Sequence, residues 1–252
     1  MDAVVGALVA QQAELAAMLG GLPEARWHLP TRCPGWDVAD VVIHLAQTDA
    51  MAVDSATGQF AAVTADPFAD TDRPASIDAG AALMVERERG LPGTELVERW
   101  SNGADRLVEV LDGMDLSTRV TWVAGELSAR TLATTRLAET WIHTGDVAGA
   151  LSVEVPPTDR LHHIARLAWR TLPYAFASAG RTMTGPVAFR LLSPGGEQWN
   201  FIPEEPAVTT ISGTAAELCQ VAARRADPSA TSLRGEGPDA GAVLALVRTY
   251  AL

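Results

Sequence analysis

Two side chains with metal-binding chemistry lie four residues apart in the segment TRLAETWIHTGDVAGAL, residues 135–151. On a helix of about 3.6 residues per turn, Glu139, His143 and Asp146 fall on one face, and Arg136 joins them at its edge. Apolar residues occupy the rest of the circumference, so this is not a simple solvent-facing stripe. Polar groups of this kind inside a protein must be paired or bound to a metal. The segment therefore predicts either an ion-pair network or part of a metal site.

A carboxylate and an imidazole at this spacing can both reach one divalent ion, but a third ligand must come from elsewhere. The chain has five histidines. The best candidate is His44, in the middle of the apolar helical segment DVADVVIHLAQTD. His28 lies in a connector, and His162 and His163 begin a later helix. Two alternatives stay open, because an E-x-x-x-H spacing often marks a surface pair and a histidine on an apolar helix is often a hydrogen-bonded core residue.

The helices that would carry these residues follow from hydrophobic spacing. Four long helices are expected, at residues 3–19, 37–56, 93–113 and 128–151. Asp37 is a good N-cap for the second, and a short helix is expected before the GLPG break at 90–93. Residues 119–128 read as extended or loop-like, and residues 57–77 have no period and suggest a long crossover or lid. The pattern predicts an antiparallel type of four-helix bundle.

The pattern changes after SVEVPPTD at residues 152–159. Beyond this point we expect a helix at 158–178, three strands in PVAFRLLS, EQWNFIP and AVTTISG, helices at 213–225 and 238–251, and a possible short strand in TSLRGE. The sequence thus predicts a multidomain α and α+β protein, with a helical bundle at 1–153 and a small α+β domain at 154–252.

Composition excludes several classes of function. The net charge is -12, and all 19 basic residues are scattered arginines, which argues against a nucleic-acid partner. The absence of lysine excludes Schiff-base chemistry on that residue. No apolar run approaches the roughly 20 residues of a membrane span, and the N-terminus lacks the features of a signal peptide. Two distant cysteines, Cys33 and Cys219, form no disulfide framework. We expect a cytoplasmic protein without a membrane partner.

Two motifs resemble those of a known family. The segment CPGWDVADVVIHLA at 33–46 is similar to the N-terminal signature of the mycothiol-dependent maleylpyruvate isomerase type of DinB-like protein, and RLAETWIHTGDV at 136–147 is similar to its R-x-x-E-x-x-x-H-x-x-D signature. Residues 213–237 resemble the end of the sterol-carrier-protein-like domain that follows the bundle in many relatives. The resemblance covers nearly the whole chain. Separately, the arginine-only composition, rich in Ala, Val and Gly, suggests a GC-rich genome of the actinobacterial kind.

The resemblance implies a DinB-like bundle that holds a divalent metal, usually zinc, through His44, Glu139 and His143, with one open position. Iron or nickel also suits two histidines and a carboxylate. Asp146 would support a ligand from outside the coordination sphere, and Arg136 would hold Glu139 or an anionic ligand. For both residues, a buried salt bridge that fixes the register of the helices is the alternative.

In the family, the metal activates the sulfur of mycothiol for addition to a small electrophilic molecule, which gives isomerisation or S-transfer. Trp36 and Trp122 are candidate walls of the cofactor pocket, although a tryptophan in a connector is often a staple for the fold. Cys33, beside the Pro-Gly turn, is expected to be a packing residue that could approach the mouth of the site.

Two other functions stay open. One is a thiol-independent, metal-dependent hydrolase, cyclase or dehydratase of secondary metabolism, in which the metal would activate water or polarise a carbonyl. The other is a non-enzymatic module that binds metal and carries an apolar ligand in its C-terminal domain. A closed four-ligand site would favour the module, and an open position would favour an enzyme. The sequence is compatible with a monomer or a homodimer.

Overall fold

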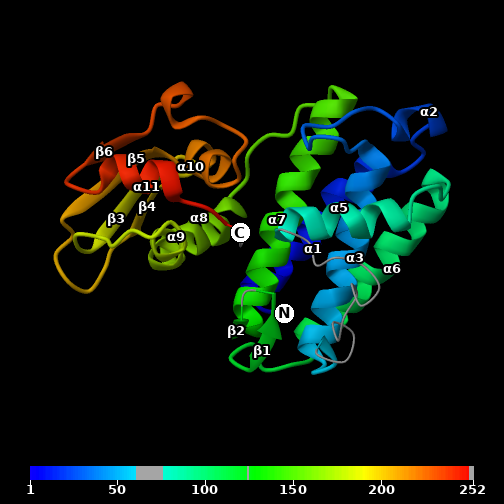
Figure 1. The fold of residues 1–252 in the computed structure, drawn as a ribbon, viewed down its shortest axis with the longest axis horizontal. Coiled ribbons are helices and arrows are strands. Elements are labelled where there is room, and N and C mark those ends of the chain that lie inside the picture. The colour runs from blue at the N-terminus through cyan, green and yellow to red at the C-terminus, as the bar shows by residue number, and fades with distance from the viewer. Residues whose placement is uncertain (61–75, 124, 250–252) are drawn as a thin grey trace. The chain divides into compact units, whose positions relative to one another are not determined.

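A computed structural model describes residues 1–60, 76–123 and 125–249, which divide into two compact units (Figure 1). The first unit comprises Met1–Val155, and the second begins at Pro156. The boundary expected from the sequence lies two residues earlier. The mixed α and α+β class predicted from the sequence is confirmed, since the first unit is mainly helical and the second combines helices with a four-stranded sheet.

Four long helices form the frame of the first unit. Its elements are α1 (Ala3–Leu19), α2 (Glu24–Trp27), α3 (Val38–Ala56), α5 (Ile77–Arg87), α6 (Gly93–Asp112), β1 (Arg119–Trp122), β2 (Gly125–Ser128) and α7 (Ala129–Leu151). Helix α1 packs against α6 and α7, and α3 packs against the same two helices, so the four enclose a common core. Each predicted boundary of these helices is met within one residue. The sequence did not predict α2, which is a single turn.

Side-chain caps fix where the site-bearing helices begin. Asp37 accepts a hydrogen bond from the backbone N–H of Asp40 at 2.9 Å, and the Asp40 carboxylate accepts one from the N–H of Asp37 at 3.2 Å. Ser128 caps α7 by accepting from the N–H of Thr131 at 3.2 Å. Each such cap is worth about 1 kcal/mol. The caps set the first residue of each helix and therefore which side chains share a face further along it.

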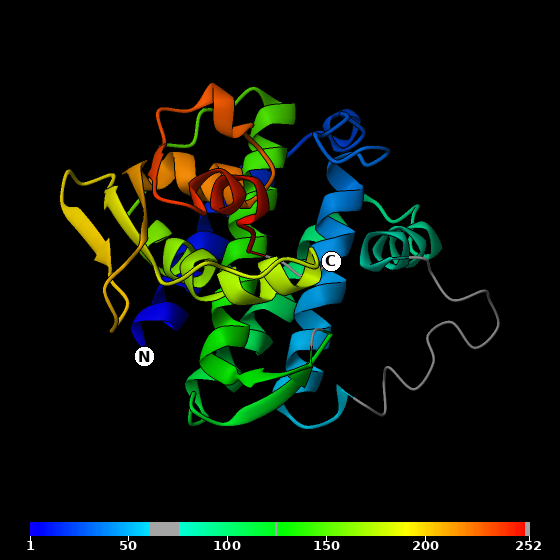
Figure 2. The same ribbon diagram turned by 60° about the vertical axis from the view of Figure 1, so that its left-hand side comes forward.

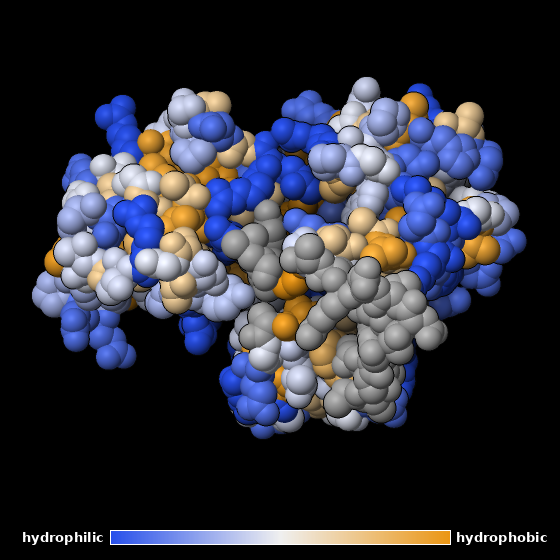
Figure 3. Space-filling model, in the orientation of Figure 1, coloured by the Kyte–Doolittle hydropathy of each residue, from blue (hydrophilic) through white to orange (hydrophobic). Residues whose placement is uncertain are grey.

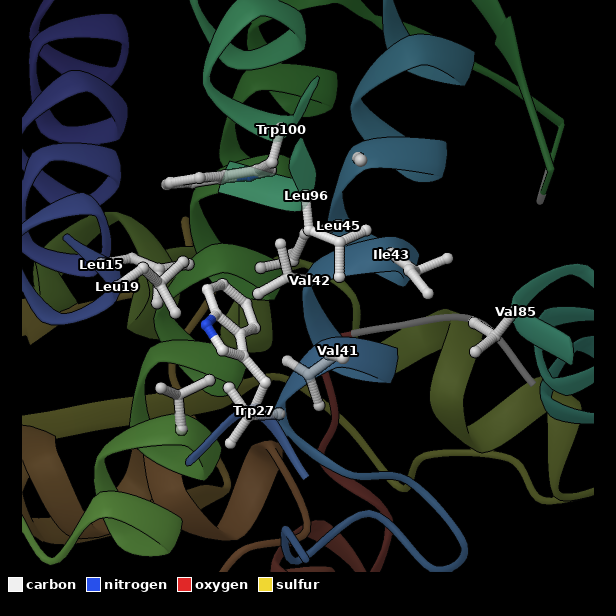
Figure 4. Packing of buried hydrophobic residues seen from close by; sticks show 14 of the residues in the cluster. Leu15, Leu19, Trp27, Val41, Val42, Ile43, Leu45, Val85, Leu96 and Trp100 are labelled. Carbon is white, nitrogen blue, oxygen red and sulfur yellow. The ribbon is translucent and has the colours of Figure 1, made fainter. Parts of the chain in front are cut away.

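The core of the first unit is built around two buried tryptophans. Trp27 from α2 and Trp100 from α6 are fully enclosed among aliphatic side chains of α1, α3 and α6 (Figure 4). The indole N–H of Trp27 donates to the carbonyl of Leu22 at 3.3 Å, which satisfies a buried donor. Helix α6 approaches this ring so closely that it begins with Gly93, where a β-carbon would lie 2.0 Å from Nε1 of Trp27.

The second unit is a four-stranded sheet with helices. Its elements are α8 (Leu161–Arg170), α9 (Leu172–Ser178), β3 (Val187–Leu192), β4 (Gln198–Phe201), β5 (Thr209–Thr214), α10 (Ala215–Ala222), the 3-10 turn η1 (Pro228–Ala230), β6 (Arg234–Glu236) and α11 (Ala240–Leu246). The strand order is β4-β3-β5-β6, and only the β3–β5 pair is parallel. The first three residues of β3 are buried, and from Phe189 on burial alternates, with Leu191 buried and Arg190 and Leu192 exposed, in a sheet that has helices against one face (Figure 2).

Three predicted elements of the second unit need correction. The single helix expected at 158–178 is two helices, α8 and α9, that separate at Thr171. Pro173 lies in the first turn of α9, where its missing N–H and its ring favour a helix start over a helix interior. The helix expected at 213–225 is shorter, because Gly213 and Thr214 complete β5 and Arg224 adopts a positive φ of 58°. Helix α11 spans only Ala240–Leu246.

Residues 61–75 of the expected crossover or lid lie outside the described residues. None of the helices in the described part of the chain is both long and apolar enough to cross a bilayer. On the face shown in Figure 3, hydrophobic residues gather in small areas among hydrophilic ones.

Candidate metal centre

Helices α3 and α7 lie against each other with opposite directions, and their polar side chains meet along this contact. The carboxylate of Asp49 on α3 pairs with Arg136 near the start of α7. His44 comes five residues before Asp49, and it faces Glu139, which comes three residues after Arg136. The antiparallel arrangement thus brings side chains from two distant sequence segments face to face. We call this row of side chains, with His44 and Asp49 on α3 and Arg136, Glu139 and His143 on α7, the seam.

The three side chains expected to bind a metal converge in this seam. Nε2 of His44 lies 3.7 Å from Oε2 of Glu139, and Nε2 of His143 lies 3.6 Å from the same oxygen. One potential ligand atom from each of the three residues lies within 4.8 Å of the other two. All three side chains are largely withdrawn from solvent, with exposed fractions of 8 to 20%. The surface pair that the spacing alone allowed is therefore excluded.

These separations suit a common cation. Bonds of about 2.0–2.1 Å to a tetrahedral zinc ion place neighbouring ligand atoms about 3.3–3.4 Å apart. The two separations from Oε2 of Glu139 are a few tenths of an ångström longer, a difference that small side-chain rotations can close. They are longer than direct hydrogen bonds, which run to about 3.2 Å for N–H···O contacts. The donor set of two imidazoles and one carboxylate therefore fits a divalent transition metal.

Asp146 fixes the orientation of the His143 ring. Its Oδ2 atom lies 3.0 Å from Nδ1 of His143, one turn further along α7. An ionised carboxylate can only accept hydrogen bonds, so Nδ1 donates its proton to Asp146 and the Nε2 edge of the ring faces Glu139, where the neutral imidazole offers Nε2 as a ligand atom. Asp146 is 1% exposed. This imidazole–carboxylate pair is the arrangement that typically supports a metal-bound histidine in proteins.

A tight turn before α3 delivers two more residues to the histidines. The N–H of Trp36 donates to the carbonyl of Cys33 at 3.0 Å, with Pro34 and Gly35 between them. Gly35 has a φ of +80°, as the third residue of a type II turn requires, and proline is favoured before it. Thr31 braces the turn, since its hydroxyl accepts from the N–H of Cys33 at 3.2 Å and donates to the Trp36 carbonyl at 2.9 Å.

The two ends of this turn contact the site from different sides. The Trp36 ring lies against both imidazoles, with centroid separations of 5.1 Å to His44 and 6.4 Å to His143. Cys33 instead reaches the Nδ1 edge of His143 and the carboxylate of Asp146. The sequence placed Trp36 as a pocket wall and Cys33 as a packing residue. Only the turn geometry shows that both touch the histidine rings.

The electrostatics of the seam favour an ionised Glu139 beside a readily protonated His143. Burial raises the pKa of Glu139, but the close contacts with the imidazoles of His143 and His44 outweigh burial and hold that pKa well below its usual value. Burial lowers the pKa of His143, but contacts with Asp146, Cys33 and Glu139 outweigh burial and hold it well above its usual value. For His44 burial dominates and lowers the pKa. The site thus carries a carboxylate and a mainly neutral His44.

Arg136 forms its hydrogen bonds with two residues of α3 that lie next to the three converging side chains. Its Nε donates to Oδ1 of Asp49 at 2.9 Å, and its NH2 nitrogen donates to the hydroxyl of Thr48 at 2.8 Å. Both Arg136 and Asp49 are almost completely buried. The sequence suggested that Arg136 holds Glu139 or an anionic ligand, yet its hydrogen bonds go to α3. Its charge still lowers the pKa of Glu139 through space. Asp49 lies on the same helix as His44, but no sequence pattern indicated this pairing.

Trp122, the other expected wall of the cofactor pocket, lies away from the three converging side chains. Its ring contacts Phe60 with a centroid separation of 5.5 Å. The carbonyl of the preceding Thr121 accepts a hydrogen bond from Ser55, which is eleven residues beyond His44 on α3. Eleven residues of helix correspond to about 16 Å. The β1–β2 hairpin therefore lies at the far end of α3.

Among the described residues, no other histidine belongs to a group of potential metal ligands. His28 is exposed and contacts the carboxylate of Asp37 at 3.1 Å. His162, in the second unit, stacks among aromatic rings, with Trp199 at 5.0 Å between centroids. The choice of His44 among five histidines agrees with where the structure places it.

The fold and the site define a helical bundle with a two-histidine, one-carboxylate candidate metal centre, joined to a small α+β unit. Residues 8–148, which include every side chain of the centre, match the family model described as "Mycothiol maleylpyruvate isomerase N-terminal domain". The chain belongs to this isomerase family, and the resemblance seen in the sequence is confirmed.

Relatives and solved structures extend this match along the chain. Two Mycobacterium tuberculosis proteins, named Uncharacterized protein Rv0036c in strain H37Rv and Uncharacterized protein MT0041 in strain CDC 1551, are each 32% identical over 98% of this chain and 95% of their own length. Crystal structures of the mycothiol-dependent maleylpyruvate isomerase and of a histidine-to-alanine mutant of it superpose with TM-scores of 0.60 and 0.61. Each covers 94% of both chains at 19% and 18% identity, so these two likenesses concern the fold.

Proposed function

We propose that this chain is a metal-dependent isomerase or S-transferase that activates a low-molecular-weight thiol, such as mycothiol, for addition to an electrophilic small molecule. His44, Glu139 and His143 would hold the metal, with zinc as the first choice. Membership of the isomerase family supports the reaction class. The assignment of residues 154–252 to a sterol-carrier-protein-like domain also stays a prediction.

The single observation that carries this proposal is the convergence of three ligand atoms at 3.6 and 3.7 Å around Oε2 of Glu139. Within the described residues, the group contains three potential ligands, one fewer than a closed tetrahedral site. Cys33 is not the fourth, because it contacts the Nδ1 edge of His143 whereas the triad uses Nε2. A three-ligand set favours an enzyme over a purely structural metal site.

When bound in such a site, a divalent metal lowers the pKa of a thiol or a water molecule in its open position. The three side chains contribute one negative charge, from Glu139, because both imidazoles bind a metal in their neutral form. A divalent ion would keep a net positive charge there and would favour an anionic fourth ligand such as a thiolate.

The protein's own residues prepare this site. Asp146 holds His143 in the tautomer that carries its proton on Nδ1, with Nε2 on the side of Glu139. Trp36 covers the imidazoles with an aromatic ring and reduces their contact with water. The contacts with His143 and His44, together with the charge of Arg136, lower the pKa of Glu139 and favour its ionised carboxylate. Such a preset environment keeps the ligands in place without reorganisation during turnover.

The test combines metal analysis with thermal unfolding. The wild-type chain and the His143→Ala variant are purified, their metal content is measured, and melting temperatures are recorded with and without mycothiol. The variant His28→Ala is the matched control, because His28 is an exposed imidazole outside the centre. We expect about one bound metal per wild-type chain and per control chain and little in His143→Ala.

Stabilisation by mycothiol should require the metal, since a ligand raises the melting temperature only where it binds the folded state. A metal-loaded chain that mycothiol does not stabilise would instead favour the thiol-independent hydrolase, cyclase or dehydratase. Equal metal contents in His143→Ala and His28→Ala would rule out the proposed centre.

A further inference from the structure

The thiol of Cys33 shares a carboxylate oxygen with the imidazole of His143. Sγ of Cys33 lies 3.3 Å from Oδ2 of Asp146, and Nδ1 of His143 lies 3.0 Å from the same oxygen. The thiol and Nδ1 are 3.9 Å apart. One buried oxygen atom therefore stands between a residue of the connector and a residue of α7.

The protons of this cluster can be assigned from the chemistry of its members. A carboxylate accepts hydrogen bonds, a thiol is a weak donor, and a neutral imidazole donates from one nitrogen only. Both the Cys33 S–H and the His143 Nδ1–H therefore donate to Asp146. A carboxylate that is 1% exposed needs such donors, because burial without partners is costly.

We infer that Cys33 is a positioning residue for the proposed metal centre. By donating to Asp146, the thiol fixes the carboxylate in the rotamer that receives Nδ1–H of His143, and this holds Nε2 toward Glu139. Cys33 acts through Asp146 and does not contact the metal, since the thiol and the triad lie at opposite edges of the imidazole. The inference rests on the proposed function, because its effect is on metal affinity.

The connector is built to hold the thiol in this place. Cys33 is the first residue of the type II turn, and its N–H donates to the Thr31 hydroxyl at 3.2 Å. The same turn places Trp36 against the imidazoles. Because these hydrogen bonds already order the backbone of Cys33, only the side-chain entropy of Cys33 is lost when its thiol orients toward Asp146. Even a weak donor can then favour one rotamer of Asp146.

The test uses two variants of nearly equal size. Cys33→Ser keeps a hydroxyl donor, whereas Cys33→Ala removes the donor. Zinc affinity is measured by competition with a chromophoric chelator, and circular dichroism verifies the fold of each variant. We expect Cys33→Ser to bind zinc like the wild type and Cys33→Ala to bind about tenfold more weakly, at the lower end of the 10–100-fold range for groups that support a metal ligand. Cys219→Ala, in the second unit, should leave zinc affinity unchanged.

The outcomes separate this inference from the proposed function. A residue that only packs would give equal affinities for Cys33→Ser and Cys33→Ala, and that result would overturn the inference alone. A thiolate-to-cobalt charge-transfer band in the cobalt-substituted wild type that disappears in Cys33→Ala would also overturn it, because Cys33 would then be a ligand. A wild-type chain that folds but binds no zinc would overturn the proposed function and this inference with it.

Discussion

Nδ1 of His143 and Oδ2 of Asp146 lie 3.0 Å apart, one turn from each other on α7, and this contact sets the direction of the whole imidazole. Because Nδ1 donates to Asp146, Nε2 faces Glu139 and the ring of His44. The spacing of the family's second motif therefore has a physical reason. Positions 139, 143 and 146 form a carboxylate, an imidazole and the support of that imidazole on one helical face.

Removing this support should weaken metal binding without abolishing it. In Asp146→Ala the His143 ring loses its acceptor, and the expected loss of zinc affinity is about 10–100-fold. Asp112→Ala is a suitable control, because Asp112 is an exposed carboxylate at the end of α6. Chelator competition measures both variants. Equal affinities would show that Asp146 does not support the ligand.

Metal affinity should rise with pH. A metal binds only the neutral imidazole, so protons compete for His143 up to its pKa, which its contacts hold well above the usual value. Binding should thus weaken as the pH falls and keep improving at pH values above the ordinary histidine pKa of about 6.5. In Asp146→Ala one cause of the raised pKa is lost, and the midpoint should move to lower pH. A profile that is flat above about pH 6.5 in the wild type would contradict this assignment.

The buried pair of Arg136 and Asp49 should behave as a unit. Replacing Arg136 by Met leaves the Asp49 carboxylate buried without its cation, at an expected cost of about 3–5 kcal/mol of unfolding free energy. The double variant Arg136→Met with Asp49→Leu should recover most of this loss, because two well-packed apolar residues need no compensation. Urea denaturation of the single and double variants measures the coupling.

The sign of the pH effect adds a second check on this pair. Burial raises the pKa of Asp49, and Arg136 opposes that rise. In Arg136→Met the folded-state pKa of Asp49 should therefore lie further above its unfolded value. A carboxyl group with a raised folded-state pKa destabilises the fold at neutral pH, and the penalty decreases as the pH falls through that pKa. A loss of stability that does not decrease in acid would argue against an uncompensated Asp49.

Two glycines of α6 should respond in opposite ways to alanine. In Gly93→Ala the new β-carbon would lie 2.0 Å from Nε1 of Trp27, so the core must shift, at a cost of about 1–3 kcal/mol. At Gly103, on the same helix, a β-carbon would meet open space, and Gly103→Ala should gain up to about 1 kcal/mol of helix propensity. Unfolding free energies of the two variants test the close approach. Similar values would mean that α6 can move away from Trp27.

Much of this molecule follows from short-range patterns. The four long helices are predictable within one residue because their spacing and caps, such as Asp37 and Ser128, act within one or two turns. The selection of His44 as the partner of Glu139 and His143 also comes from the sequence, because few histidines are available. Where the prediction fails locally, at the division of α8 from α9, the signal is Pro173, which favours a helix start.

The contacts between elements could not be read in the same way. Arg136 lies three residues before Glu139 in sequence, yet its partner is Asp49. Because α7 runs antiparallel to α3, Glu139 faces His44, and Arg136 faces a residue further along α3. The position of Trp122 also depends on packing, since the hairpin that carries it lies beside the far end of α3. Cys33 reaches Asp146 only because the Pro-Gly turn directs it there. The sequence by itself determined the helices and the chemical types on each face, whereas the packing of helix on helix, which depends on the whole core, decided which of those side chains meet.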